Sequence, residues 1–268
     1  MKKKRLIPVL LLKNGQLVQS KEFKRYQNLG NPVWAVKRLS EWASDEMIYL
    51  DISKDDQYDL NRDDLAHPNR QTFLEIIQDV AKMSFMPIAV GGKIRSLEDI
   101  RTRLSLGADK VVINTQPLID KSFIGAAARE FGSQCVVVSV DVKKTAQGYR
   151  VMSHGATKET SYAPAEWTKI AENEGAGEIL LNSVDRDGMR TGYDLELLEE
   201  VASKAKIPVI ACGGAGEWGH FQEAFEKTSV DAVAAANIFH YVDQSVYLAK
   251  KFLYERQCPV RPADLLSV

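Results

Sequence analysis

The sequence has 268 residues, of which 45% are hydrophobic and 26% are charged, and its formal net charge is −1 at pH 7. This length suits one large α/β domain, and the composition is that of an ordinary globular protein. Neither value supports a nucleic-acid or membrane partner, so we expect neither.

The cysteines and the N-terminus bear on compartment and cofactors. Three scattered cysteines do not make a disulfide framework or a zinc site, so we expect no metal and no resident cofactor. The start Met-Lys-Lys-Lys-Arg resembles a signal peptide, but the apolar run after it stops at Lys13 without a cleavage motif. We therefore expect a cytoplasmic protein.

The first half of the chain alternates strand and helix patterns. Residues 5–12 form a continuous apolar run, typical of a strand buried on both faces, and residues 13–31 are predicted to be a long loop and a candidate lid. Pro32 opens a helix, and a second mobile loop is predicted to reach Pro68. The helix from Pro32 carries apolar residues at helical spacing, namely Val33, Val36, Leu39 and Trp42. Further elements are predicted as strands at 46–52, 86–90 and 110–114 and a helix at 70–83.

The second half continues the alternation. Pro117 is predicted to start a helix, and residues 143–162 are predicted to be a hairpin-like excursion after a strand at 135–141. Further strands are predicted at 178–183, 207–212 and 231–236. The remaining helices are expected around Trp167 and Ile170, at 195–204, after Gly216, and at 246–252, where Phe239 and Tyr241 help to close the end.

A repeat relates the two halves. Gly91-Gly92 and Gly213-Gly214 each end an apolar run, and Asp109 and Asp231 each open the next one, with 122 residues between matching positions. Strand, glycine turn, helix and strand make a βαβ unit, so the repeat predicts a single (β/α)8 TIM barrel, α/β in class, built from two similar half-barrels over residues 1–268. Glycines after a strand also let a phosphate approach backbone N–H groups, although tight turns alone would explain them.

Strand ends carry the candidate catalytic groups, because a barrel of this kind has its reactive side chains there. Asp141 ends an apolar run, where burial favours acid–base use, although a structural carboxylate is the alternative. Asp187 lies in the loop after 178–183, where an Asp-Gly turn would explain it equally well. The position that matches Asp141 in the first half is Leu11, so one half lacks its carboxylate.

Four charged residues mark the opposite end of the barrel. Arg5, Glu46, Lys110 and Glu178 stand at strand starts, and a plugging salt-bridge network would explain them. The alternative is a charged ring around an axial opening. His67, His154, His220 and His240 show no ligand spacing.

The sequence resembles the cyclase subunit of imidazole glycerol phosphate synthase, the HisF family, over about residues 3–255. The motifs that carry this resemblance are Lys4-Arg-Leu-Ile7, Asp45-Glu-Met-Ile-Tyr-Leu-Asp-Ile52, Gly107-Ala-Asp-Lys110, Phe131-Gly-Ser-Gln134, Gly175-Ala-Gly-Glu-Ile-Leu-Leu181, Asp185-Arg-Asp-Gly188 and Gly213-Gly-Ala-Gly216. The resemblance implies a twofold-repeated barrel with a HisH-like glutaminase subunit docked on its N-terminal face. It makes Arg5, Glu46, Lys110 and Glu178 an ammonia gate and Asp141 one of two catalytic carboxylates.

Two phosphate sites are also implied by the resemblance. One would use Gly92, Asn114 and Thr115, with Lys93 beside them, and the other would use Gly188, Gly214, Ala236 and Asn237, with Gly213. The substrate is accordingly expected to be a small phosphorylated or nucleotide-linked molecule.

The sequence departs from the family at positions that the resemblance assigns to the histidine-pathway reaction. The family's general base falls on Leu11, its loop lysine on Gln19, its third turn glycine on Lys93 and its serine at the last phosphate site on Asn237. A leucine cannot move protons. This pattern resembles a HisF-like branch associated with surface-polysaccharide genes, in which ammonia is thought to convert an acetamido group into an acetamidino group.

Three functions remain open on the sequence. The first is an ammonia-using synthase subunit for an amidino-sugar step, and the second is an authentic histidine-pathway cyclase whose base is Asp51 or Asp187. The third is a non-catalytic conduit that passes ammonia to a separate ATP-dependent amidotransferase.

Overall fold

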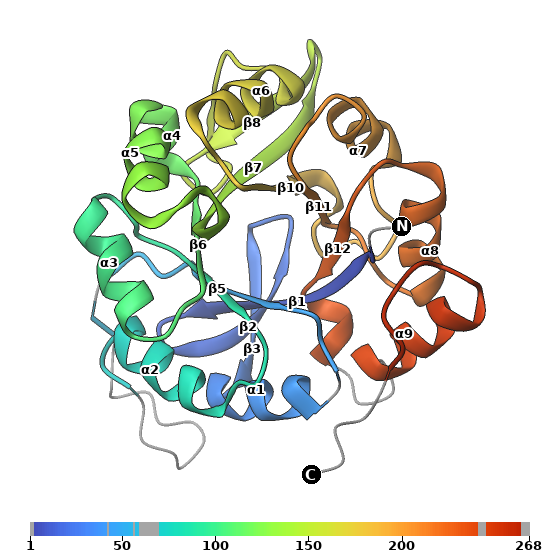
Figure 1. The fold of residues 1–268 in the computed structure, drawn as a ribbon, viewed down its shortest axis with the longest axis horizontal. Helices are drawn as coiled ribbons and strands as arrows, with labels where there is room; N and C mark the ends of the chain where they lie inside the picture. Colours follow the sequence, from blue (N-terminus) through green and yellow to red (C-terminus); the bar gives the residue numbers. More distant parts are fainter. Residues whose placement is uncertain (1–2, 42, 56, 59–69, 241–244, 264–268) are drawn as a thin grey trace.

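The structure is a computed structural model that describes residues 3–41, 43–55, 57–58, 70–240 and 245–263. Eight parallel strands form a closed barrel, and the helices surround it, as Figure 1 shows. In order around the barrel the strands are β1 (Arg5–Lys13), β4 (Met47–Asp51), β5 (Ile88–Gly91), β6 (Lys110–Ile113), β7 (Val136–Thr145), β10 (Glu178–Ser183), β11 (Val209–Cys212) and β12 (Ala232–Ala235). The predicted (β/α)8 fold is therefore confirmed.

The helices lie between successive strands and bury their apolar faces against the barrel. They are α1 (Pro32–Glu41), α2 (Phe73–Met83), α3 (Leu97–Ser105), α4 (Thr115–Ile119), α5 (Ser122–Phe131), α6 (Pro164–Glu174), α7 (Leu195–Ala202), α8 (Trp218–Lys227) and α9 (Val246–Glu255), with short 3-10 turns η1 (Ser133–Cys135), η2 (Val184–Arg186) and η3 (Asn237–His240). None of the described helices is long and apolar enough to cross a membrane.

The predicted loop at residues 13–31 is wrong, because this stretch forms an antiparallel hairpin. β1 runs on to Lys13 and turns through Asn14 and Gly15, which have φ of 51° and 75°. These left-handed values are those of a two-residue hairpin turn, for which Asn-Gly is the favoured pair. The returning strand β2 (Gln16–Lys21) pairs with the end of β1 on one side and with β3 (Arg25–Gly30) on the other. We call β2 and β3, with the turns before and between them, the first hairpin.

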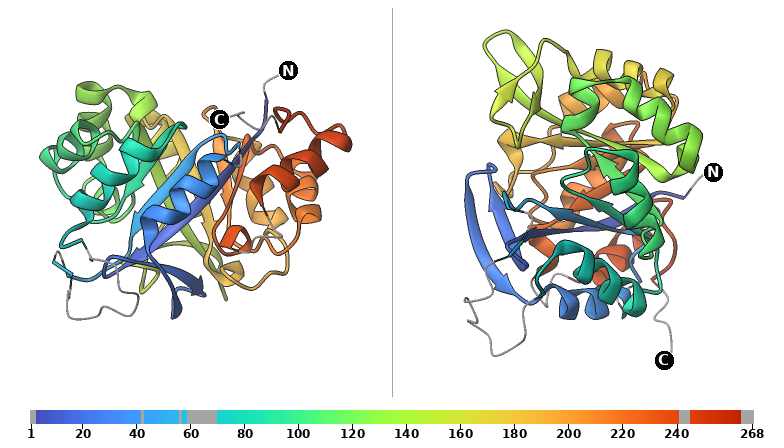
Figure 2. Two further views of the ribbon diagram at one scale, coloured as in Figure 1. Left: turned by 90° about the horizontal axis from the view of Figure 1, so that it is seen from below. Right: turned by 90° about the vertical axis from the view of Figure 1, so that its left-hand side faces the viewer.

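The predicted excursion at residues 143–162 is confirmed as a second hairpin. β7 extends beyond the barrel to Thr145 and pairs with β8 (Gly148–Ser153), which pairs in turn with the short β9 (Lys158–Glu159). The first hairpin follows the first strand of one half-barrel, and the second hairpin follows the first strand of the other. Both hairpins project from the same end of the barrel, as the right-hand view of Figure 2 shows.

Other predicted boundaries differ by a few residues. The helix predicted to start at Pro117 instead starts at Thr115 and is interrupted at Asp120, whose carboxylate accepts hydrogen bonds from the backbone and hydroxyl of Ser122. The predicted helix at 70–83 begins at Phe73, because Thr72 caps it. Trp42, Tyr241 and most of the second predicted loop lie outside the described residues.

The barrel interior is a separate apolar cluster. Alternate residues of each strand face inward. The buried members of this cluster are Ile7, Val9, Leu11, Val18, Ile48, Ala89, Val112, Val137, Leu180, Ile210, Ala232 and Ala234. This apolar column joins the end that carries the hairpins, called the mouth, to the end where the strands start, called the base.

Candidate functional site

Asp141 lies at the mouth on the inward-facing side of β7, two residues after the buried Ser139. Its carboxylate accepts a hydrogen bond from Asn114 Nδ2 at 2.7 Å and a longer one from Asn182 Nδ2 at 3.4 Å. Burial raises the pKa of Asp141 to about 6, while the two amides oppose this shift and the nearby Asp187 charge adds to it. A carboxyl that titrates near neutrality can donate or accept a proton in catalysis.

Leu11 occupies the matching position of the other half-barrel. Ile7, Val9 and Leu11 face inward along β1, as Val137, Ser139 and Asp141 do along β7. Leu11 is 8% exposed and belongs to the apolar cluster of the barrel, and the partly buried Tyr26, Leu50 and Ile52 pack against that cluster. One side of the mouth is therefore apolar, and the other holds the Asn114, Asp141 and Asn182 group.

Asp187 binds the first hairpin. Its carboxylate accepts hydrogen bonds from Ser20 Oγ at 2.6 Å and from the Phe23 backbone N–H at 3.2 Å, and its carbonyl accepts one from the Glu22 N–H at 3.0 Å. Burial raises the pKa of Asp187, whereas the bonds from Ser20 and Phe23 lower it. We call this set of contacts the hairpin latch; a catalytic role for Asp187 stays a prediction.

The first predicted phosphate site lies beside the β5 and β6 ends, and we call it the first rim. Asn114 is turned toward Asp141, and Thr115 Oγ1 accepts a hydrogen bond from the His154 N–H at 3.3 Å. The Lys93 ammonium lies 3.3 Å from the Asp51 carboxylate and also donates to the Asp55 carbonyl. At Gly92, φ is 108° and an added Cβ would lie 2.3 Å from the Asp51 carbonyl oxygen, so only glycine fits.

The second predicted phosphate site, called the second rim, contacts the first hairpin. Asn237 Nδ2 donates to the Ser20 carbonyl at 2.8 Å. A Cβ added to Gly188 would lie 2.3 Å from the same oxygen. The loops after β10 and β11 are joined by a hydrogen bond from the Gly192 N–H to the Gly214 carbonyl at 3.0 Å. Gly213 lies against the Ser183 carbonyl, and the partly buried Ala236 packs against the barrel cluster.

The four charged residues at the base form a closed ring. Arg5 lies 2.7 Å from Glu46 and 3.0 Å from Glu178, and Lys110 lies 3.0 Å from each of the same carboxylates. Each cation therefore bridges both anions. Burial raises the pKa of Glu46, with Lys110 and Arg5 opposing it. For Arg5 burial lowers the pKa, but Glu178 and Glu46 outweigh it, so the net shift is upward.

Sequence reasoning missed several participants. Asn182 stands at a strand end, so the rule that selects Asp141 also places Asn182 at the mouth, but not its hydrogen bond to the Asp141 carboxylate. Ser20 binds Asp187 from β2 and Phe23 binds it from the turn that follows, and the sequence holds no signal for either contact. The described residues bring together no group of three or more His, Cys, Asp or Glu side chains that could hold a metal.

The fold and the site define a class: a two-half (β/α)8 barrel with a buried carboxylate at its mouth and a closed ion-pair ring at its base. A family model described as histidine biosynthesis protein matches residues 5–245, and the chain belongs to that family, within its HisF branch. It is 41% identical over 260 residues to the imidazole glycerol phosphate synthase subunit HisF of Geobacillus kaustophilus (strain HTA426), covering 96% of this chain and 99% of that protein.

Further relatives are equally similar. The protein of the same name from Dehalococcoides mccartyi (strain BAV1) is 41% identical over 258 residues, covering 96% and 98% of the two chains. That from Anoxybacillus flavithermus (strain WK1) is 40% identical over 260 residues, covering 96% and 99%.

Proposed function

We propose that the chain is the synthase subunit of a glutamine-dependent complex. Ammonia made by a glutaminase subunit enters at the charged ring, crosses the barrel and is used or delivered at the mouth in a biosynthetic amidation. The substrate we favour is an acetamido sugar that becomes an acetamidino sugar for a surface polysaccharide, in an ATP-driven exchange in which the ammonia nitrogen replaces the departing amide oxygen. The observation that carries this proposal is that the charged ring at the base is complete while the position that matches Asp141 at the mouth is Leu11.

The base supports the ammonia part of the proposal. Removing charges from water is costly, and an apolar plug of similar volume is often at least as stable as a buried ion-pair network. The interior above the ring is apolar, with Ile7 and Ile48 among its residues, which suits a small neutral molecule better than an ion. A ring of charges that can separate would admit ammonia while its resting ion pairs close the opening.

The mouth supports a single proton-transfer group. Asp141, with a pKa of about 6, is held by Asn114 and Asn182 and can give a proton to a leaving oxygen or take one from an incoming nitrogen. The apolar side chain of Leu11 offers no second acid or base, but it offers van der Waals contact to an apolar substituent such as a methyl group.

A second candidate is an authentic imidazole glycerol phosphate synthase cyclase. The identity of 41% over 96% of the chain and the names of the relatives favour it, as does the retained Asp141. Asp51, which with Asp187 is one of the two bases considered for this alternative, is 5% exposed and accepts bonds from the Ser53 N–H and hydroxyl while pairing with Lys93. These contacts hold it away from proton exchange at the mouth.

One assay separates the two candidates. The purified protein would be supplied with ammonium salt and the ribonucleotide substrate of the histidine-pathway cyclase. We expect turnover at least about 10²-fold below that of an authentic cyclase, because one acid–base group is missing. Equal turnover would rule out the diverted function. An acetamido sugar converted only when an ATP-dependent amidotransferase is added would identify the chain as a conduit.

The partner is tested by complex formation. Co-expression with a HisH-like glutaminase and size-exclusion chromatography should give a heterodimer that contacts the surface around Arg5, Asp45 and Glu46. Lys110→Met should leave glutamine hydrolysis intact while lowering the fraction of ammonia that reaches the substrate; Lys227→Met, on the outer helix α8, is the control. If no complex forms, and Lys110→Met lowers only thermal stability, the ring is a plug.

A further inference from the structure

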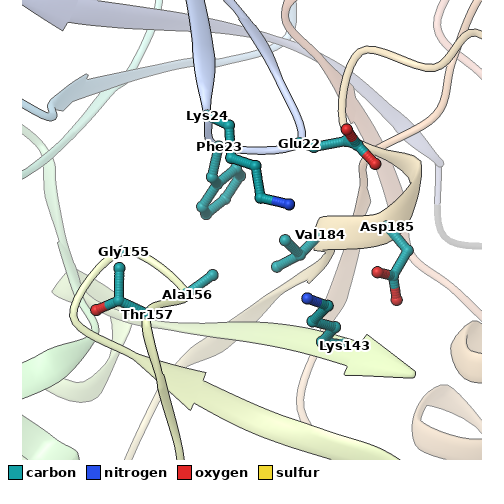
Figure 3. Close-up of a pocket in the computed structure, with 9 residues that line it drawn as sticks. All are labelled: Glu22, Phe23, Lys24, Lys143, Gly155, Ala156, Thr157, Val184 and Asp185. Carbon is teal, nitrogen blue, oxygen red and sulfur yellow. The ribbon is translucent and has the colours of Figure 1, made fainter. Parts of the chain in front are cut away.

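A cavity of about 100 Å³ lies at the mouth between the two hairpins. Its walls come from four segments. They are the turn between β2 and β3 with Lys24, the turn between β8 and β9 with Ala156, the β7 residue Lys143, and the start of η2 with Asp185. Figure 3 shows these walls facing one another across the cavity. We call it the lysine cavity; none of the residues predicted for the two phosphate rims lines it.

The lysine cavity adjoins both rims. The turn of the second hairpin is joined to the first rim by the hydrogen bond from the His154 N–H to Thr115 Oγ1 at 3.3 Å. The turn of the first hairpin is joined to the second rim by the hairpin latch, in which the Glu22 and Phe23 N–H groups donate to Asp187, the neighbour of Gly188. A substrate that reaches from one rim to the other therefore extends beside this cavity.

The charges in the cavity are arranged for an anion. The ammonium groups of Lys24 and Lys143 extend into it from opposite walls (Figure 3), and the described part of the chain shows no ion pair for either lysine. The Asp185 carboxylate lies to one side, where it accepts the Lys144 backbone N–H at 2.7 Å. Glu22 lies on the same side, in the turn that the latch holds. The two cations thus face the open space, and the two carboxylates flank it.

We propose that the lysine cavity is a third anion site of the mouth, which binds a phosphate-sized oxyanion of the substrate between Lys24 and Lys143. Charged hydrogen bonds from two ammonium groups are among the stronger polar contacts available to a phosphate oxygen. The site bears on the substrate of the proposed function. A substrate with one phosphate at each end fills the two rims alone, whereas a third anion position calls for a further acidic group, as in a nucleoside-diphosphate-linked or an acidic sugar.

The test is to locate and measure binding of simple oxyanions. Crystals of the whole protein would be soaked in sodium selenate, and pyrophosphate would be titrated calorimetrically into the protein. We expect an anomalous selenium peak between Lys24 and Lys143. The Lys24→Met/Lys143→Met double variant should lose that peak and bind pyrophosphate at least about tenfold more weakly, since even one charged contact is worth a factor of about ten or more.

The matched control is Lys144→Met. Lys144 neighbours Lys143 on β7 but pairs with Glu196 at 3.1 Å, and its loss removes one positive charge, as does the single Lys143→Met variant with which it is compared. If Lys144→Met weakens pyrophosphate binding equally, the effect is one of general electrostatics, and the proposal is overturned. A cavity that stays empty would also overturn it, as would a peak that survives in the double variant, which would be an adventitious ion only. These outcomes leave the ammonia function standing, because that function is judged by turnover and complex formation.

Discussion

At the scale of single residues, Asp141 combines burial with a titratable charge, and this makes stability depend on pH. Its pKa is raised by burial to about 6 from an ordinary value of 3.8. The folded protein therefore holds this proton more tightly than the unfolded chain does. The stability contributed by the protonated group is fully present below pH 3.8 and is lost as the pH rises through 6.

Asp141→Asn should remove this fall in stability with rising pH, because the amide does not titrate. The Oδ1 atoms of Asn114 and Asn182 have no hydrogen-bond partner, and after a flip of its amide either side chain can accept a hydrogen bond from the new amide at position 141. We expect the variant to be more stable than the wild type at pH 8, by about 1–3 kcal/mol, with the difference closing below pH 4. Urea unfolding at pH 4, 6 and 8 measures this. A variant that is less stable at every pH would show that the hydrogen bonds of the carboxylate outweigh its burial.

Leu11→Asp should have the opposite effect on the pH dependence of stability. A carboxylate placed in the apolar cluster of Val9 and Val18 is costly when charged, so we expect the free energy of unfolding to fall by about 2–5 kcal/mol at pH 7 and by less at pH 5. Turnover of the histidine-pathway ribonucleotide should rise. Leu11→Asn is the control, with a similar loss of apolar packing but no pH dependence and no gain in turnover. No gain from Leu11→Asp would mean that other departures also block the cyclase reaction.

At the scale of elements, the two hairpins differ in how predictable they were. The second was expected from its polar, glycine-containing stretch. For the first, the length of the polar stretch predicts a loop, although Asn14-Gly15 between apolar runs is a strong hairpin signal. The strand ends placed Asp141 and Asn114 at the mouth correctly. Their mutual hydrogen bond could not be foreseen, because it depends on the register between β6 and β7, which is set by the closure of the whole barrel.

The hairpin latch should control the exposure of the first hairpin. Asp187→Ala removes the acceptor of Ser20 Oγ and of the Phe23 N–H, and each bond to a charged group is worth about 1.5–3 kcal/mol. We expect amide hydrogen exchange at residues 16–21 and 25–30 to accelerate at least about tenfold, while the amides of β5 and β11 are unchanged. Asp185→Ala is the control from the same loop. Unchanged exchange in the first hairpin would show that strand pairing with β1 alone holds it.

At the scale of the whole molecule, the charged ring links four strands that are distant in sequence. Lys110→Met leaves Glu46, which is 3% exposed, and Glu178 to share Arg5, and we expect this to lower the free energy of unfolding by about 3–5 kcal/mol. Adding Glu178→Gln should restore part of that loss. A double-mutant cycle measures the coupling, with the exposed Lys227 and Glu223 pair as a control expected to couple by less than about 1 kcal/mol. Additive losses at the ring would mean that its charges act independently.

The two hairpins also determine how this molecule can change over evolutionary time. Each grows from the first strand of its half-barrel and meets the other above the mouth, so the residues at their turns lie outside the apolar column that stabilises the barrel. Exchanging a turn while keeping the backbone contacts of the hairpin latch alters what the mouth accepts at little cost to folding. A designer could graft turns from a relative onto this barrel for the same reason, and recruit it to a new substrate while the core and the base stay as they are.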